Sequence, residues 1–523
     1  MDRARRGWVL LAVALAILTT LPYLLGFAQE GEARFTGFVF GVEDGNSYIA
    51  KMLRGAEGDW LFRTPYTNMP QTGFLAFLPY LLLGKLTSIP GQHVQLVVLF
   101  HLFRIVGIFA LAFVLERLFS LFFPSERVRW VGAALVMAGG GLGWLAPFGM
   151  QVLWQERTPL EFYSPEAFGF LSVLGLPHLV WERAFLFWGL YVLLKSEQED
   201  VLLKERMGAG ISWLLAGLMQ PQSLMIGMGV VGLYGAGRLM FARLANWAWD
   251  LRRFLRTALW LGLFAAPLVI YTGVCFLTDP YLRVWAQQNL ITSPPLSDYF
   301  LAYAPVIPLA IWGGRAVLRE RNGTGVFFLL WAAVFIPAAY LPYDLQRRLT
   351  EGGWAACVVL ALLGYLRTSV RIQRAARVVG VTLFIPAVIL LAGGGLAVGA
   401  VRPPVFRPGP ETAMFLKIRQ LLPKDAVILA EYDTSNALPA WTPQFTLIGH
   451  GPESAHLREL RPKVETFLAD PANGDLEWLA AQRVTHVLFT PNDAGRGAAK
   501  NLPWLTELAE VEGYTLYAVE YSP

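Results

Sequence analysis

Residues 73–90 read GFLAFLPYLLLGKLTSIP, and this stretch decides how many times the chain crosses a membrane. It is apolar overall, but Pro79 interrupts it, Lys85 lies within it and Pro90 ends it. A membrane-spanning helix needs about 20 consecutive, predominantly apolar residues. We therefore interpret this stretch as a re-entrant or interfacial helix that does not cross.

Longer apolar runs flank this stretch on both sides. The first extends from Trp8 to Phe27 and follows Arg3, Arg5 and Arg6, a pattern that favours a signal anchor over a cleaved signal peptide. It predicts a cytoplasmic N-terminus. The other predicted spans are 94–120, 130–149, 177–195, 207–221, 223–241, 257–277, 299–318, 325–342, 353–367 and 378–401. The chain is thus predicted to cross about eleven times.

The distribution of arginine supports this topology. The basic loops contain Arg127 and Arg129; Arg238, Arg243, Arg252, Arg253 and Arg256; and Arg367, Arg371, Arg374 and Arg377. If residues 73–90 crossed the membrane, these loops would all lie outside, against the positive-inside rule. Without that crossing the loops are cytoplasmic, residues 28–93 form a long first outer loop, and the C-terminus lies outside.

The composition is that of an integral membrane protein. Of 523 residues, 55% are apolar and only 15% charged, and the mean hydropathy is +0.46. The net charge of +5 arises mostly from the basic loops, so it predicts no nucleic-acid partner. Cys275 and Cys357 both fall in predicted spans, which excludes a disulfide framework and a zinc site built on cysteines.

The sequence changes character after Arg402. A proline-rich linker leads into alternating helical and extended patterns that predict a small α/β domain. Predicted strands are 427–430, 445–448, 484–489 and 514–519, and predicted helices are 411–422, 453–468, 475–482 and 503–511. The fold class is thus a multi-pass α-helical membrane protein with a C-terminal soluble α/β domain. Its expected parts are a transmembrane domain, 1–401, and an extracytoplasmic domain, 402–523.

An acidic pair follows the first predicted span. Glu43 and Asp44 precede an amphipathic helix that is predicted to start near Asn46. Paired acids at a membrane face suit a general base or metal ligands. Helix capping and solvation are the alternative explanation.

Two further outer segments carry ionisable residues, which are costly at a membrane. In one, Glu166 is followed by His178 and Glu182, which lie four residues apart on one face of a predicted helix. The alternative there is a purely structural histidine. The other segment contains Gln346, Arg347 and Arg348. Arginine suits bidentate recognition of a lipid phosphate, and a nonspecific contact with anionic headgroups is the alternative.

Taken together, these features resemble the GT-C superfamily of membrane glycosyltransferases, which includes protein O-mannosyltransferases and bacterial aminoarabinose transferases. The resemblance covers the membrane region as topology, and its motifs are short. Glu43-Asp44 with Ser47 and Tyr48 looks like the family's first acidic motif, whose carboxylate is the expected base. The chain departs from well-known members because this motif is not Asp-x-Asp and because 150–176 lacks an Asp-centred motif.

The resemblance implies transfer of a hexose or pentose from a polyprenyl-phosphate sugar to an acceptor at the outer membrane face. Asp44 or Glu43 would be catalytic. The expected substrate-binding residues are Tyr48, Glu166, His178, Glu182, Gln346, Arg347 and Arg348. A divalent metal is compatible with this scheme, but no ligands are assigned. The acceptor is a glycan, lipid or protein of the cell envelope, and membrane lipids are further partners. The alternatives are a lipid-linked sugar transporter or flippase and a non-catalytic membrane assembly protein.

Overall fold

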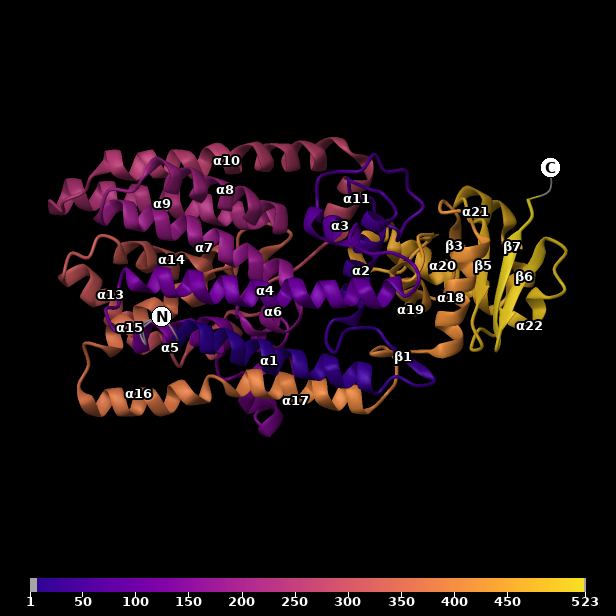
Figure 1. Cartoon of the computed structure of the whole chain (residues 1–523), viewed down its shortest axis with the longest axis horizontal. Helices are drawn as coiled ribbons and strands as arrows, with labels where there is room; N and C mark the ends of the chain where they lie inside the picture. The colour runs from indigo at the N-terminus through magenta and orange to yellow at the C-terminus, as the bar shows by residue number, and fades with distance from the viewer. Residues whose placement is uncertain (1–6, 522–523) are drawn as a thin grey trace. The chain divides into compact units, whose positions relative to one another are not determined.

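The computed structural model describes residues 7–521 and is shown in Figure 1. Arg3, Arg5 and Arg6 lie outside the described residues. The chain forms two compact units. Unit 1 comprises residues 1–21, 102–273 and 291–393, and unit 2 comprises residues 22–101, 274–290 and 394–523. These units reflect packing rather than membrane insertion, and the domain boundary at 401/402 stays a prediction.

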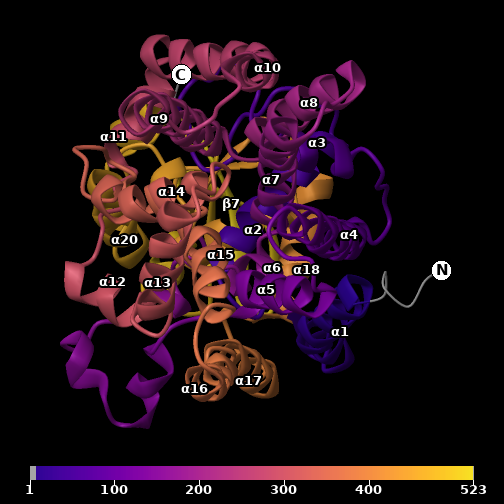
Figure 2. The ribbon, with the colours of Figure 1, turned by 90° about the vertical axis from the view of Figure 1, so that its left-hand side faces the viewer.

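Among its described residues, unit 1 is built mainly from helices. The α-helices that lie wholly in it are α5 (Glu126–Ala138), α6 (Phe170–Gly175), α7 (Pro177–Gln198), α8 (Leu203–Met219), α9 (Pro221–Ala245), α12 (Leu296–Tyr303), α13 (Ile307–Arg319), α14 (Gly325–Ala338), α15 (Gly353–Tyr365) and α16 (Val370–Thr382). Four helices have residues in both units: α1 (Gly7–Ala28), α4 (Gln92–Ser120), α10 (Leu251–Thr278) and α17 (Ile385–Gly399). Figure 2 looks along the helices, and α15 lies among α5, α13 and α14. Nearly all of α15 is buried because apolar side chains cover every face of it.

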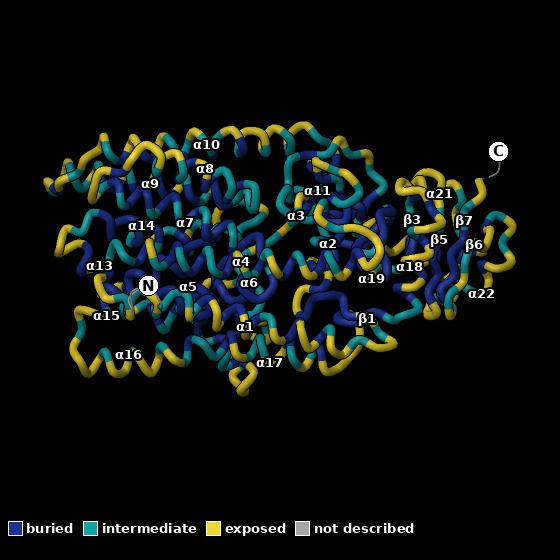
Figure 3. The backbone as a smooth tube through the Cα atoms, in the orientation of Figure 1, coloured by how far each residue is buried: buried dark blue, intermediate teal, exposed yellow. Residues whose placement is uncertain are grey.

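Five helices of the described chain are long and apolar enough to cross a membrane: α1, α4, α9, α10 and the combined α16–α17 segment. A sixth results if α12 and α13, bent by 79°, count as one span. Along α10, Leu259, Leu263 and Ile270 are exposed, as the tube of Figure 3 shows for this helix. Such an apolar surface fits contact with lipid. The structure therefore has a multi-pass helical fold, while the count of about eleven crossings stays a prediction.

The stretch that decides the predicted topology contains one short helix, α3 (Leu78–Gly84). Seven residues rise only about 10 Å as a helix, which is far less than the thickness of the hydrocarbon. This helix does not cross a membrane by itself. It packs against α2 (Val42–Ala56) in unit 2. The backbones touch at two glycines, because a Cβ on Gly84 would lie 1.7 Å from the carbonyl oxygen of Met52, and one on Gly55 would lie 2.0 Å from that of Leu81.

Helix α2 starts earlier than the sequence predicts. It begins at Val42, after Gly41 in the left-handed conformation at φ +56°, so Glu43 and Asp44 lie inside its first turn rather than before it. Carboxylates are favourable there because they face the unpaired N–H groups and the positive end of the helix dipole. The expected start near Asn46 was therefore wrong by one turn.

The remaining elements of unit 2 include a small sheet and the C-terminal domain. β1 (Ala33–Phe35) pairs antiparallel with β2 (Phe406–Pro408). The other elements are α11 (Pro280–Gln288), α18 (Gly409–Leu421), β3 (Val427–Leu429), α19 (Tyr432–Ala437), β4 (Phe445–Thr446), η7 (Gly451–Glu453), α20 (Leu457–Ala469), α21 (Leu476–Ala481), β5 (His486–Phe489), α22 (Arg496–Ala499), β6 (Leu505–Val511) and β7 (Tyr514–Val519). β1 and β2 have three residues each, which is too short for an alternating apolar and polar pattern to identify them from the sequence.

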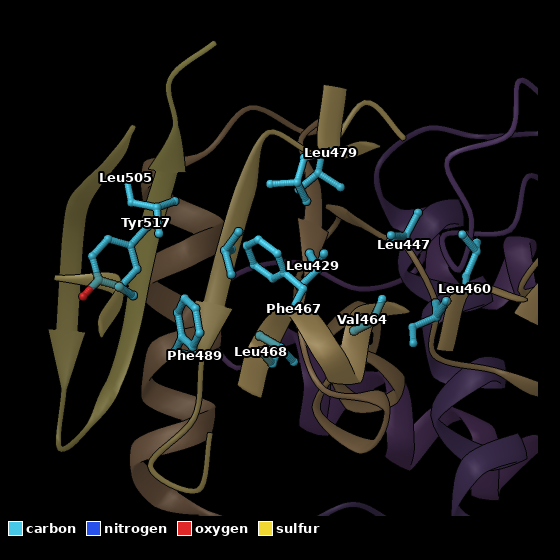
Figure 4. Packing of buried hydrophobic residues seen from close by; sticks show 14 residues of the cluster. Leu429, Leu447, Leu460, Val464, Phe467, Leu468, Leu479, Phe489, Leu505 and Tyr517 are labelled. Atoms are coloured by element: carbon cyan, nitrogen blue, oxygen red, sulfur yellow. The ribbon is translucent and has the colours of Figure 1, made fainter. Parts of the chain in front are cut away.

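The C-terminal sheet has five strands in the order β4-β3-β5-β7-β6. β3 is parallel to β4 and β5, whereas β7 is antiparallel to β5 and β6. Successive side chains on β5 alternate between two cores, with Val487 and Phe489 in one and Leu488 in the other. The first core includes α20, whose Phe467 lies near Leu429 in Figure 4. The second includes α18, so helices cover both faces of the sheet.

The edge strand β6 corrects one prediction. Residues 503–511 were expected to be helical because Leu, Glu and Ala favour helices, but 505–511 pair with β7. Glu512 and Gly513 both have positive φ, at 44° and 87°, which is the backbone of a two-residue hairpin turn. Tertiary pairing through this hairpin overrides the local propensity. The Glu512-Gly513 dipeptide is the signal in the sequence that would have indicated this hairpin.

We predict that Leu429→Ala destabilises the sheet domain by about 2–5 kcal/mol, because Leu429 is fully buried between the sheet and α20. The matched control is Leu508→Ala on β6, where the side chain is 41% exposed. It should change stability by less than about 0.5 kcal/mol. Thermal unfolding of the full chain in detergent, followed by proteolysis of the domain, measures both. Equal effects would contradict the assignment of this core.

Candidate functional site

The predicted site residues fall into an acidic set in unit 2 and a charged set in unit 1. Glu43, Asp44 and Tyr48 belong to unit 2, on α2. Unit 1 contains the other residues, Glu166, His178, Glu182, Gln346, Arg347 and Arg348.

In the acidic set, Glu43 is held by the C-terminal domain. Its Oε1 accepts hydrogen bonds from the Tyr432 hydroxyl at 2.6 Å and from the Gly451 N–H at 3.0 Å. Its backbone carbonyl accepts a third from the amide of Asn436 at 3.3 Å. One carboxylate oxygen of Glu43 thus accepts two hydrogen bonds, and Glu43 connects α2 to the sheet domain.

Asp44 has a different environment. Its side chain is 61% exposed, and its Oδ1 lies 3.2 Å from Nε2 of His450. The imidazole itself is buried, and its ring lies 5.5 Å from that of Tyr66. An exposed carboxylate against a buried imidazole is an arrangement that can accept a proton from an incoming hydroxyl group.

Behind His450 lies a buried ion pair. The Lys51 ammonium is 2.6 Å from Oε1 of Glu453, and both side chains are almost fully buried. Ser47 donates to the same oxygen at 3.1 Å, and Thr64 donates to Oε2 at 2.7 Å. Lys51 also lies 4.5 Å above the ring of Phe77. The glutamate is therefore well satisfied, as a buried charge has to be.

The charges of this network shift the pKa values of two groups. Burial alone would lower the pKa of His450, but the nearby carboxylates of Glu453 and Asp44 outweigh it and raise the pKa. Burial would raise the pKa of Glu453, whereas Lys51 and His450 outweigh it and lower the pKa. The network therefore favours the imidazolium and the carboxylate.

Tyr48 lies on the same helix and belongs to an aromatic stack. Its ring is 5.1 Å from that of Tyr80 and 6.0 Å from that of Phe100. Such stacks stabilise packing. The expected role of Tyr48 in substrate binding stays a prediction.

The charged set of unit 1 is built around Arg183. This side chain makes a bidentate pair with Glu351, with Nε–Oε1 at 2.7 Å and Nη2–Oε2 at 2.8 Å. It also donates to Ser172 at 3.0 Å. Nearby in sequence, Glu166 is buried and lies 3.5 Å from Nε of Arg348. The structure thus brings together Glu166 and Arg348, two of the predicted site residues.

The two candidate phosphate-binding arginines lie on η5 (Gln346–Thr350). Arg347 is 4.7 Å above the ring of Tyr163. Arg348 donates to Oε1 of Gln222 at 3.3 Å. Gln346 has a structural contact, because its Oε1 accepts from the N–H of Ser293 at 3.1 Å.

On α7, His178 and Glu182 are both buried, one turn apart. Glu182 is fully buried, and neither of its carboxylate oxygens makes a hydrogen bond of acceptable geometry within residues 7–521. The charge of Arg183 and the side chain of Ser223 lie near Glu182 and offset part of the cost of burying a carboxylate.

Sequence reasoning missed the residues of the C-terminal domain that reach the acidic pair: Tyr432, His450 and Glu453. Strand and helix patterns offered no signal for them. The segment His450-Gly451-Pro452-Glu453 follows β4, where a loop histidine beside a glutamate is the only hint. Among the described residues, no group of three or more His, Cys, Asp or Glu side chains has the geometry of a metal site. We therefore assign no residues to a metal.

We predict that Glu453→Gln destabilises the chain by about 3–5 kcal/mol, because it leaves Lys51 buried without its counter-charge. The double variant Lys51→Met with Glu453→Gln should recover part of this loss, and thermal unfolding of the four proteins gives the coupling. The folded pKa of Glu453 lies below its ordinary value. Its contribution is therefore present above about pH 4.5 and is lost as the pH falls through the lowered pKa. If the losses of stability in the two single variants simply add in the double variant, the pairing of Lys51 with Glu453 is contradicted.

No family model and no curated protein matches the sequence of this chain. Solved structures do match. The archaeal oligosaccharyltransferase AglB from Archaeoglobus fulgidus, in complex with an inhibitory peptide and a dolichol-phosphate, has a TM-score of 0.57 at 12% identity, with 92% of this chain and 69% of that chain covered.

Two other solved structures are similar over nearly the whole of this chain. ArnT from Cupriavidus metallidurans, bound to undecaprenyl phosphate, has a TM-score of 0.53 at 14% identity and covers 98% of both chains. The arabinofuranosyltransferase AftD from Mycobacteria has a TM-score of 0.52 at 14% identity, covering 97% of this chain and 42% of that one. The chain therefore has the fold of the GT-C membrane glycosyltransferases.

Proposed function

We propose that this chain is a membrane glycosyltransferase that moves a sugar from a polyprenyl-phosphate carrier to a hydroxyl of an acceptor at the outer membrane face. The observation that carries the proposal is the exposed Asp44 carboxylate, held by the buried His450 at the start of α2. In a chain with this fold, a carboxylate so held suits the removal of a proton from an acceptor.

Between the two acids, the contacts favour Asp44 as the base. Glu43 Oε1 already accepts two hydrogen bonds, and moving Glu43 would release Tyr432 and Gly451 from α2. Asp44 has a largely exposed side chain, and its Oδ1 lies 3.2 Å from Nε2 of His450. Its exposure to solvent makes Asp44 the more accessible acceptor for a substrate proton.

The proposed transfer is a single displacement. The acceptor oxygen attacks the anomeric carbon while Asp44 takes its proton, and the bond from that carbon to the phosphate oxygen breaks. The electron pair of that bond leaves with the polyprenyl phosphate. Arg347 and Arg348 are proposed to bind this phosphate and to offset its growing negative charge. Glu166, His178, Glu182 and Gln346 are proposed to orient the sugar or the acceptor, with Tyr48 supporting α2.

The comparisons support a lipid-linked donor. Two of the similar structures were solved with dolichol-phosphate or undecaprenyl phosphate bound. We propose only that the carrier is a polyprenyl phosphate and that the sugar is a hexose or pentose.

A lipid-linked sugar transporter or a membrane assembly protein would have the same helices without needing a base. Each of them predicts carrier binding or partner binding that is insensitive to Asp44. The assay below separates these functions from transfer.

We predict that Asp44→Asn lowers kcat for sugar transfer by about 10²–10⁴-fold, because the amide cannot accept the proton. Glu43→Gln should cost about tenfold or less, through a weakened hold on α2. Purified protein, radiolabelled polyprenyl-phosphate sugars and envelope acceptors give the rates. Carrier binding should persist in both variants. Carrier binding without transfer in the unmodified chain would exclude the enzyme.

We predict that Arg348→Ala weakens the binding of polyprenyl phosphate by about tenfold to a hundredfold, because a charged hydrogen bond to the phosphate is lost. Arg374→Ala is the matched control, since Arg374 is exposed on α16. It should bind normally. Binding to detergent-solubilised protein is measured by tryptophan fluorescence or calorimetry. Equal weakening in both variants would indicate only nonspecific attraction to the headgroup.

A further inference from the structure

The imidazole of His450 lies between two carboxylates. Its Nε2 is 3.2 Å from Oδ1 of Asp44, on α2, and its Nδ1 is 3.5 Å from Oε1 of Glu453, on η7. The first distance is a hydrogen bond, and the second is an ion-pair distance without hydrogen-bond geometry. Both ring nitrogens therefore face oxygen atoms that only accept hydrogen bonds.

A neutral imidazole fits this arrangement poorly. It carries one N–H and one lone pair, so one of its nitrogens would face a carboxylate without a proton between them. The imidazolium has an N–H on both sides, and it places a positive charge against both carboxylates. The position of both ring nitrogens against carboxylate oxygens therefore favours the doubly protonated ring.

The surrounding charges act in the same direction. Asp44 comes from α2 and Glu453 from η7, and Glu43 of α2 accepts a hydrogen bond from the neighbouring Gly451 N–H, whereas the charge of Lys51 opposes protonation of the ring. With a neutral histidine these four groups carry a net charge of two negative units, and with an imidazolium the five carry one. The hydroxyl of Tyr432 bonds Glu43, and Tyr66 packs against the ring, but neither is charged at neutral pH.

We propose that His450, from the C-terminal sheet domain, is a positioning residue that holds Asp44 as an imidazolium, so that transfer requires protonated His450. The inference rests on the proposed function. It assigns the C-terminal domain a part in the chemistry: the domain supplies the group that fixes the rotamer and the charge of the base. His450 keeps its two protons throughout the transfer step, and the acceptor proton goes to Asp44.

The pH dependence follows from the sign of this interaction. Protonation of His450 is raised above that of a free histidine, so the imidazolium is present below pH 6.5 and is lost as the pH rises through the raised pKa. Transfer should therefore decline on the alkaline side of its pH profile. An exposed carboxylate alone would give no such decline.

The experiment compares three variants of the full chain in detergent. His450→Gln retains an N–H donor but cannot become charged, and it should lower kcat about tenfold, leave the donor KM within about threefold and remove the alkaline decline. His450→Ala should lower kcat by about a hundredfold. The matched control is His486→Gln on β5, in the same domain, which should leave both the rate and the pH profile unchanged. A His450→Gln protein that keeps the alkaline decline would overturn the proposal.

A second measurement does not require activity. The chain has six histidines, and their ring carbons can be followed by NMR after labelling, with His450 assigned from the signal lost in His450→Gln. Asp44→Asn should lower the titration midpoint of His450. The control His486→Asn, on β5 of the same domain, should leave the midpoint of His450 unchanged. If no sugar transfer is found but this midpoint moves, the proposed function fails and the pairing stands. A midpoint that does not respond to Asp44→Asn overturns the inference itself.

Discussion

The buried pair of Lys51 and Glu453 is the interaction on which the arrangement of unit 2 depends. It joins α2 to η7 through two residues that are 402 positions apart in the chain. Two charges withdrawn from water are tolerated only when the hydrogen bonds around them are complete, and Ser47 and Thr64 supply these bonds. Any shift of α2 against the C-terminal domain would break this pair, so the pair fixes the register in which Asp44 meets His450.

The same register explains why two adjacent acids have different environments. On a helix, neighbouring residues point about 100° apart, so Glu43 and Asp44 cannot face the same partner. Glu43 meets Tyr432 and the backbone of Gly451, whereas Asp44 meets the imidazole. Glu43 attaches α2 to the sheet domain, whereas Asp44 remains accessible to solvent. The close contact of α2 with α3 through Gly55 and Gly84 helps to hold the helix that carries both acids.

Much of the fold could be predicted from the sequence, because the patterns are local. Apolar length identified α4 and α10, and short extended patterns after Arg402 identified β3, β5 and β7. β6 was missed because its residues favour a helix and its strand exists only through pairing with β7. The acidic pair was identified by its position after the first span. His450 could not be predicted as a site residue, because its role depends on a contact with Asp44, 406 residues away in the chain.

The pairing of β1 with β2 has a consequence for how the chain is made. These strands join the start of the first predicted outer loop to the residues that follow α17, and Thr36 bonds Val405 across 369 residues. During synthesis the first loop emerges long before its partner exists, so β1 stays unpaired until α17 and the residues after it have been made. The acidic cluster is therefore a late product of biogenesis, and a ribosome that stops early leaves a chain with helices but without a site.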